Sequence, residues 1–167
     1  MRILVFLHGT AIMHAGGAGM PRALRVRQVR ERHPSVRDYA AYVPIGDAAA
    51  KLRRWQAQGA VIAYLSSHHT PDDVAKDAAV LQRYGFPEGE VFARQSGEDY
   101  GAATERAQPD VLIEDDCESI GGAVEMTHPM LRPGLRERVT SIVVREFEGI
   151  DHLPDDIAVL IGGGTGR

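Results

Sequence analysis

Short runs of hydrophobic residues alternate along this chain with longer segments in which hydrophobic residues recur every three or four positions. A short continuous run is typical of a strand that is buried on both faces. The wider spacing is typical of a helix with one face against a core. The pattern predicts strands at 2–7, 61–65, 91–93, 111–113 and 141–144, and helices at 46–58, 70–85 and 98–107.

Two of the predicted helices have clear boundaries. One stops at Gly59, and the other begins at Thr70 and ends at Gly85. Thr70 is followed by a proline and two aspartates, and a threonine cap, an early proline and carboxylates near the positive helix end all stabilise a helix start. We predict core faces formed by Ala48, Leu52 and Trp55 in the first helix and by Val74, Ala78 and Leu81 in the second.

Alternating strands and helices predict the fold class. They favour an α/β domain with three layers, in which a parallel, Rossmann-like sheet lies between helices. The 167 residues suit one domain at 1–160 with a small basic insert at about 13–43 after the first strand, and a frayed tail at 161–167.

Polar residues follow several of the predicted strands directly. In parallel sheets the ligand site lies beyond the carboxyl ends of the strands. We therefore expect one site to be formed by His8-Gly9-Thr10, Ser66-Ser67-His68-His69, Arg94 and Glu114-Asp115-Asp116.

Composition narrows the classes of partner. The chain has one cysteine, no apolar run long enough to cross a bilayer and a net charge of −4, so we expect a cytoplasmic protein without disulfides or a membrane partner. Between residues 21 and 54, nine Lys or Arg stand against three Asp or Glu, which predicts an anionic ligand or partner. The acidic remainder and scarce aromatic residues argue against nucleic acid. The oligomeric state is left open.

The residues after the strands resemble the motifs of the haloacid dehalogenase-like (HAD) superfamily, whose members are mostly phosphatases. The first family motif is a strand ending in Asp-x-Asp-Gly-Thr, and the chain has Phe6-Leu7-His8-Gly9-Thr10 there. The second is a strand ending in Ser or Thr, matched by Ser66, and the fourth is a strand ending in an acidic pair, matched by 109–116. The resemblance spans about residues 2–120 and implies a HAD-like fold.

The chain departs from the family pattern at the catalytic positions. The resemblance places the family's nucleophilic aspartate at Phe6 and its general acid/base at His8. A phenyl ring can neither attack phosphorus nor hold a metal, so the aspartyl-phosphate route is closed. The family's lysine has no clear counterpart: Gly101 stands near its place, with Arg94 and Arg106 nearby.

The resemblance implies roles for the residues that remain. Phosphate would be bound by Gly9, Thr10, Ser66, Ser67 and Arg94. Asp115 and Asp116 would hold Mg²⁺, weakened by the loss of the first-motif carboxylate. Four arginines of the insert would gather an anion or bind an acidic partner, namely Arg22, Arg25, Arg27 and Arg30.

Three functions are compatible with the sequence. The first is a non-catalytic or nearly inactive protein that binds a phosphorylated small molecule or another anionic partner. The second is a divergent metal-dependent phosphoester hydrolase in which His8 and Asp115 are catalytic. The third is a transition-metal protein that uses His8, His68 and His69 with Asp115.

Overall fold

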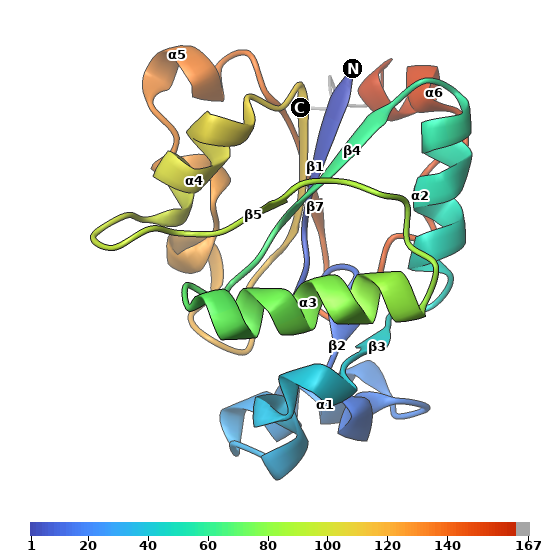
Figure 1. The fold of residues 1–167 in the computed structure, drawn as a ribbon, viewed down its shortest axis with the longest axis vertical. Coiled ribbons are helices and arrows are strands. Elements are labelled where there is room, and N and C mark those ends of the chain that lie inside the picture. Colours follow the sequence, from blue (N-terminus) through green and yellow to red (C-terminus); the bar gives the residue numbers. More distant parts are fainter. Residues whose placement is uncertain (163–167) are drawn as a thin grey trace.

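A five-stranded parallel sheet forms the centre of the computed structural model, which describes residues 1–162 (Figure 1). The strand order is β5-β4-β1-β6-β7. The strands are β1 (Arg2–Phe6), β4 (Val61–Leu65), β5 (Val91–Phe92), β6 (Val111–Asp115) and β7 (Thr140–Val144). The helices are α1 (Arg22–Arg30), α2 (Ala48–Ala57), α3 (Pro71–Arg83), α4 (Tyr100–Ala107), α5 (Pro133–Arg136) and α6 (Ile157–Gly162).

The predicted elements are confirmed, and their ends differ from the prediction by no more than two residues. Residues 161 and 162 of the predicted tail end α6, and 163–167 lie outside the described residues. Among the described helices, none is long and apolar enough to cross a membrane.

Alternation along the strands builds a three-layer α/β fold. Ile3 and Val5 of β1 pack with α2, α3 and α6 on one face of the sheet. Leu4 points to the other face, where it packs with α4 and α5. The Rossmann-like fold class is therefore confirmed.

The predicted core face is confirmed for α2 and is partly wrong for α3. In α2, the predicted residues Ala48, Leu52 and Trp55 are fully buried. In α3 the prediction is partly wrong, because the buried residues are Asp77, Val80 and Leu81, whereas Val74 is half-buried and Ala78 is exposed. The helix is rotated so that a carboxylate lies on its core face.

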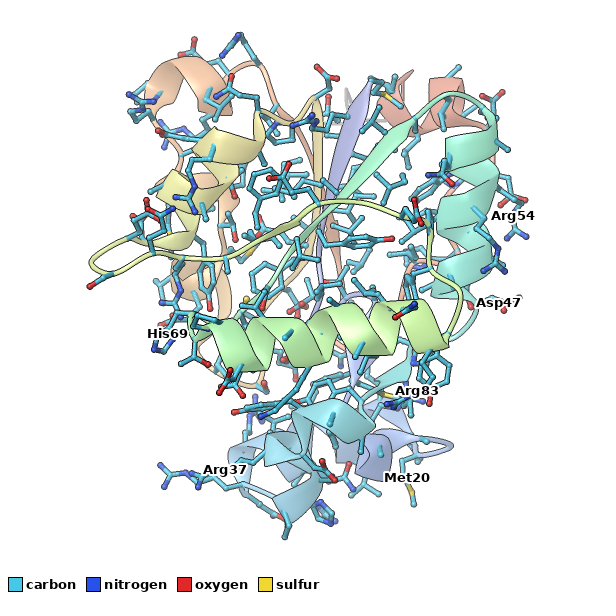
Figure 2. All side chains as sticks on the ribbon, viewed as in Figure 1. Met20, Arg37, Asp47, Arg54, His69 and Arg83 are labelled. Atoms are coloured by element: carbon cyan, nitrogen blue, oxygen red, sulfur yellow. The ribbon has the colours of Figure 1, made fainter. Side chains whose placement is uncertain are left out.

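The two ends of the insert lie side by side. Strand β2 (Ile12–Met13) pairs antiparallel with β3 (Val43–Pro44), and α1 lies between them in the chain. The insert lies beyond the carboxyl ends of the sheet strands, next to α3 (Figure 1). Its exposed residues include several arginines as well as Met20, and Arg37 projects away from the rest of the molecule (Figure 2).

Gly101 lets α4 approach the 3-10 turn at His128–Met130 closely. A Cβ at residue 101 would lie 2.5 Å from the backbone oxygen of Met130. Although alanine favours a helix by up to about 1 kcal/mol over glycine, we expect Gly101→Ala to lower the free energy of unfolding by roughly 1–3 kcal/mol because backbone must move. Gly134→Ala in α5 is the control, since no atom lies within 4 Å of its Cβ position. Urea denaturation measures both, and equal stability of the two variants would contradict the prediction.

Candidate functional site

A cavity of about 440 Å³ lies at the carboxyl ends of the strands. Of the predicted site residues, seven line it: His8, Gly9, Ser67, His68, His69, Arg94 and Asp115. Parallel register explains this convergence, because Phe6 pairs with Leu65 and Val5 with Ile113, so the segments after β1, β4 and β6 begin at the same level.

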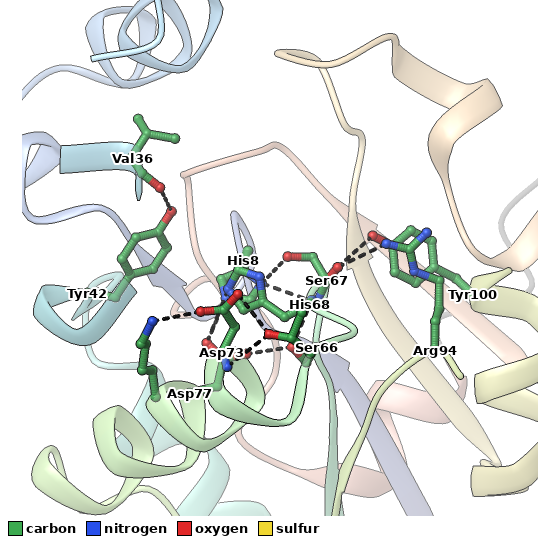
Figure 3. A network of polar contacts seen from close by, with 12 residues as sticks. His8, Val36, Tyr42, Ser66, Ser67, His68, Asp73, Asp77, Arg94 and Tyr100 are labelled. Carbon is green, nitrogen blue, oxygen red and sulfur yellow. Dashed lines mark hydrogen bonds and ion pairs between the residues drawn. The ribbon is translucent and has the colours of Figure 1, made fainter. Parts of the chain in front are cut away.

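His8 is held by hydrogen bonds on both ring nitrogens (Figure 3). Its Nε2 lies 2.9 Å from Oδ1 of Asp77, and its Nδ1 lies 2.6 Å from Oγ of Ser67. Asp77 is fully buried, and its other oxygen, Oδ2, accepts a 2.5 Å hydrogen bond from Oγ of Ser66. The side chain of His8 is therefore fixed by a carboxylate from α3.

The predicted phosphate ligands separate into two groups. Ser67 and Gly9 line the cavity, whereas the described cavity lining does not include Ser66 or Thr10. The hydroxyl of Ser66 is buried and donates to Asp77, and the hydroxyl of Thr10 is buried and donates to Asp115. These two hydroxyls orient carboxylates and lie outside the described lining of the cavity.

Arg94 brings positive charge to the cavity. Its guanidinium stacks on the ring of Tyr100, 4.3 Å from the centroid, and its Nη2 donates to the backbone oxygen of Ser67. The Nε of Arg94 is buried and has no hydrogen-bond partner among the described residues. Arg106, the other arginine near the predicted lysine position, instead pairs with Glu98. Arg94 is thus the cation that this part of the site offers to an anion.

The opposite side of the cavity is acidic. Asp115 accepts hydrogen bonds from the hydroxyl of Thr10 (2.8 Å) and from the backbone N–H of Cys117 (2.9 Å). Burial, followed by the nearby charge of Glu146, raises the pKa of Asp115 to about 7. Glu146 comes two residues after β7 and was missed from the sequence, although its position just past a strand could have revealed it.

The three carboxylates of the run Glu114-Asp115-Asp116 do not form one cluster, because Glu114 is separate from the other two. Asp115 and Asp116 cluster with Glu146, with one oxygen of each within 4.8 Å of the others. Glu114 instead accepts hydrogen bonds from the backbone N–H groups of Thr127 and His128. Adjacent residues of a strand point to opposite faces, so Glu114 is separated from this cluster.

Asp115, Asp116 and Glu146 fit a divalent cation such as Mg²⁺, because they offer three hard oxygen donors close together. Such a cation would neutralise the cluster and allow an anion to approach. Phe6, at the carboxyl end of β1, adds no oxygen donor to this set.

Cys117 and the arginines of the insert add no reactive group to the described cavity. Burial and the neighbouring carboxylates raise the pKa of the Cys117 thiol, so little of the nucleophilic thiolate forms. The four arginines of α1 are not among the described residues that line the cavity. Two of them, Arg22 and Arg30, pair with Glu118 after β6.

Comparisons with known proteins show similarity only at the level of the fold. No protein-family model and no curated protein matches this sequence. A solved structure of the class C acid phosphatase from Bacillus anthracis matches with a TM-score of 0.53 and 12% identity, covering 99% of this chain and 79% of the other. The same enzyme with tungstate bound gives 0.51 and 13%, with the same coverage.

A chain from a Pnkp1/Rnl/Hen1 complex also matches, with a TM-score of 0.52 and 12% identity. The match covers 87% of this protein but only 46% of that chain, so the protein spans less than half of its length. The chain has a Rossmann-like fold of the HAD type. At this identity the activities of these proteins do not transfer with the fold.

Proposed function

We propose that this protein binds a phosphorylated small molecule in the 440 Å³ cavity and does not use the aspartyl-phosphate route. The observation that carries the proposal is Phe6. Its ring lines the cavity at the carboxyl end of β1 and packs edge-on against Tyr100, with 5.2 Å between centroids. A HAD-type phosphatase that works through an aspartyl phosphate needs a carboxylate at this position.

Arg94 supports anion binding at this place. Its guanidinium is preorganised by stacking on Tyr100, and its buried Nε lacks a partner among the described residues. The hydroxyl of Ser67 lines the same cavity. A phosphoryl group would receive charge-assisted hydrogen bonds from Arg94 and a further contact from Ser67.

The acidic cluster of Asp115, Asp116 and Glu146 opposes the binding of a phosphoryl group. Asp115 and Glu146 line the cavity and repel a phosphoryl group unless they are neutralised. A divalent cation on Asp115, Asp116 and Glu146 would remove that repulsion. We therefore expect phosphate binding to need Mg²⁺.

Neither ring nitrogen of His8 is free to activate water. Nε2 is directed at the buried Asp77, and Nδ1 is hydrogen-bonded to Ser67. This geometry favours binding over the hydrolase in which His8 is the general base.

The test uses the purified full chain with a panel of phosphomonoesters, with and without Mg²⁺. Thermal stabilisation measures binding, and released phosphate measures turnover. We expect Mg²⁺-dependent binding without turnover. Arg94→Gln should weaken binding roughly tenfold or more, because a hydrogen bond to a charged group contributes about 1.5–3 kcal/mol.

Arg106→Gln is the matched control, since Arg106 pairs with Glu98 and is absent from the described cavity lining. Equal affinities of the two arginine variants would overturn the assignment of Arg94. Failure of wild type to bind any phosphomonoester would overturn the proposed function itself.

The second candidate is a metal-dependent phosphoester hydrolase. It is favoured by the acidic cluster, because a divalent cation held by Asp115, Asp116 and Glu146 would supply Lewis-acid chemistry beside the cavity. Turnover that requires Mg²⁺ and disappears in Asp115→Asn would establish this function in place of simple binding.

A further inference from the structure

In the lining of the same cavity, separate from the acidic cluster, two histidines converge on one buried carboxylate. Asp77 is fully buried on the core face of α3, while His8 and His68 line the cavity. His8 Nε2 lies 2.9 Å and His68 Nε2 lies 3.8 Å from the same atom, Oδ1 of Asp77. The three ligand atoms all lie within 4.8 Å of one another.

We propose that His8, His68 and Asp77 form a binding site for a divalent transition metal, for which Zn²⁺ is the natural probe. The proposal is independent of phosphate binding. It replaces the metal set expected from the sequence, because Asp77 takes the place of Asp115 and the exposed His69 is not part of the cluster.

The spacing of the atoms fits a metal and is not fully explained by an ion pair. Zinc binds nitrogen and oxygen at about 2.0–2.1 Å in a tetrahedron, which places neighbouring ligand atoms roughly 3.3 Å apart. The two distances to Asp77 lie on either side of this value. An ion pair between His8 and Asp77 would explain the 2.9 Å distance. It would not explain why His68 Nε2 also lies 3.8 Å from the same oxygen, which is too far for a hydrogen bond.

His68 supplies a second, independent observation. Its Nε2 is buried and has no hydrogen-bond partner among the described residues, although it is directed toward Asp77. The His68 ring packs against Tyr39 in a tilted arrangement, with 4.1 Å between centroids, and this contact restricts the orientation of the imidazole.

The hydrogen bonds around the cluster have the arrangement that orients metal ligands. Ser66 occupies Oδ2 of Asp77 and leaves Oδ1 at the cluster, while Ser67 occupies Nδ1 of His8 and leaves Nε2 there (Figure 3). Ligating histidines and carboxylates are typically fixed in this way through their outer atoms. Three protein ligands beside a cavity leave a fourth position for water or an anionic ligand, as in catalytic zinc sites.

The experiment is a metal titration of the full chain after chelator treatment. Competition with a chromophoric chelator gives the Zn²⁺ affinity, and Co²⁺ absorption gives the coordination geometry. We expect one tightly bound equivalent and the intense visible bands of tetrahedral Co²⁺. His68→Gln should lower the affinity by more than about tenfold, since even loss of an outer hydrogen bond costs 10- to 100-fold.

His69→Gln is the matched control, because His69 is the adjacent, exposed imidazole. It should bind Zn²⁺ like wild type, and so should Asp115→Asn, which alters the separate carboxylate cluster. Equal affinity in wild type and His68→Gln would overturn the proposal, and so would loss of binding in Asp115→Asn alone. The Co²⁺ spectrum decides without any variant: weak, octahedral absorption of wild type would also overturn the site.

Discussion

Asp115→Asn is expected to make the metal-free protein more stable at pH 8 by a few kcal/mol. The Asp115 carboxyl is 3% exposed, and its pKa rises from 3.8 to about 7, chiefly because burial penalises the charged form. Each unit of pKa difference between the folded and unfolded states corresponds to about 1.4 kcal/mol. Asparagine removes the charge, and its side chain can still pair with Thr10 and Cys117.

The pH dependence has a definite sign. The folded protein holds the Asp115 proton until about pH 7, whereas the unfolded chain releases it near 3.8. The folded state therefore binds more protons between these values, and stability falls as pH rises through that window. Burial also raises the pKa values of Glu114 and Glu146, so the variant should retain part of the slope.

Urea denaturation of metal-free protein at pH 5 and pH 8 measures this effect. The difference between wild type and Asp115→Asn should be larger at pH 8. Glu88→Gln is a suitable control, because Glu88 is exposed and surface substitutions usually change stability by less than about 0.5 kcal/mol. If Asp115→Asn were the less stable protein at pH 8, Asp115 would have to be ionised and compensated in the fold. Mg²⁺ should stabilise wild type and not Asp115→Asn.

The sequence alone is sufficient to predict the strands of the sheet and the site residues that directly follow them. Continuous apolar runs located all five strands of the sheet, because a strand covered on both faces has few polar positions. The rule that sites lie past the carboxyl ends of parallel strands then brought His8, Ser67, Arg94 and Asp115 together. This inference needs only the strand positions and no knowledge of side-chain contacts.

The other site residues depend on the direction in which each side chain points, and the amino-acid sequence does not specify this direction. Asp77 was missed because α3 was assigned the apolar face of Val74 and Ala78, whereas Asp77 lies one helical turn before Val80 and Leu81 on the true core face. Ser66 was interpreted as a ligand of phosphate because its partner Asp77 was unknown. The hydroxyl that follows β4 therefore binds the protein itself.

Asp77→Leu is expected to lower the free energy of unfolding of the metal-free protein by roughly 2–6 kcal/mol, because leaving each of two hydrogen-bonding groups without its partner inside the protein costs about 1–3 kcal/mol. Leucine has nearly the same shape but accepts no hydrogen bond. Nε2 of His8 and Oγ of Ser66 would both lose a short contact, and Ser66 is fully buried, so water does not replace its hydrogen bond. Asp77→Asn should cost less, because the amide oxygen still accepts one of these bonds.

Asp72→Leu is the control on the same helix. Asp72 is exposed in the first turn of α3, so its loss removes only a favourable interaction with the helix dipole, about 0.3–1 kcal/mol. Urea denaturation compares the two variants. A second comparison, Ser66→Ala alone and together with Asp77→Leu, separates the contribution of the serine bond from that of His8. If the losses for Ser66→Ala and Asp77→Leu added without coupling, the two side chains would not depend on each other, contrary to their 2.5 Å contact.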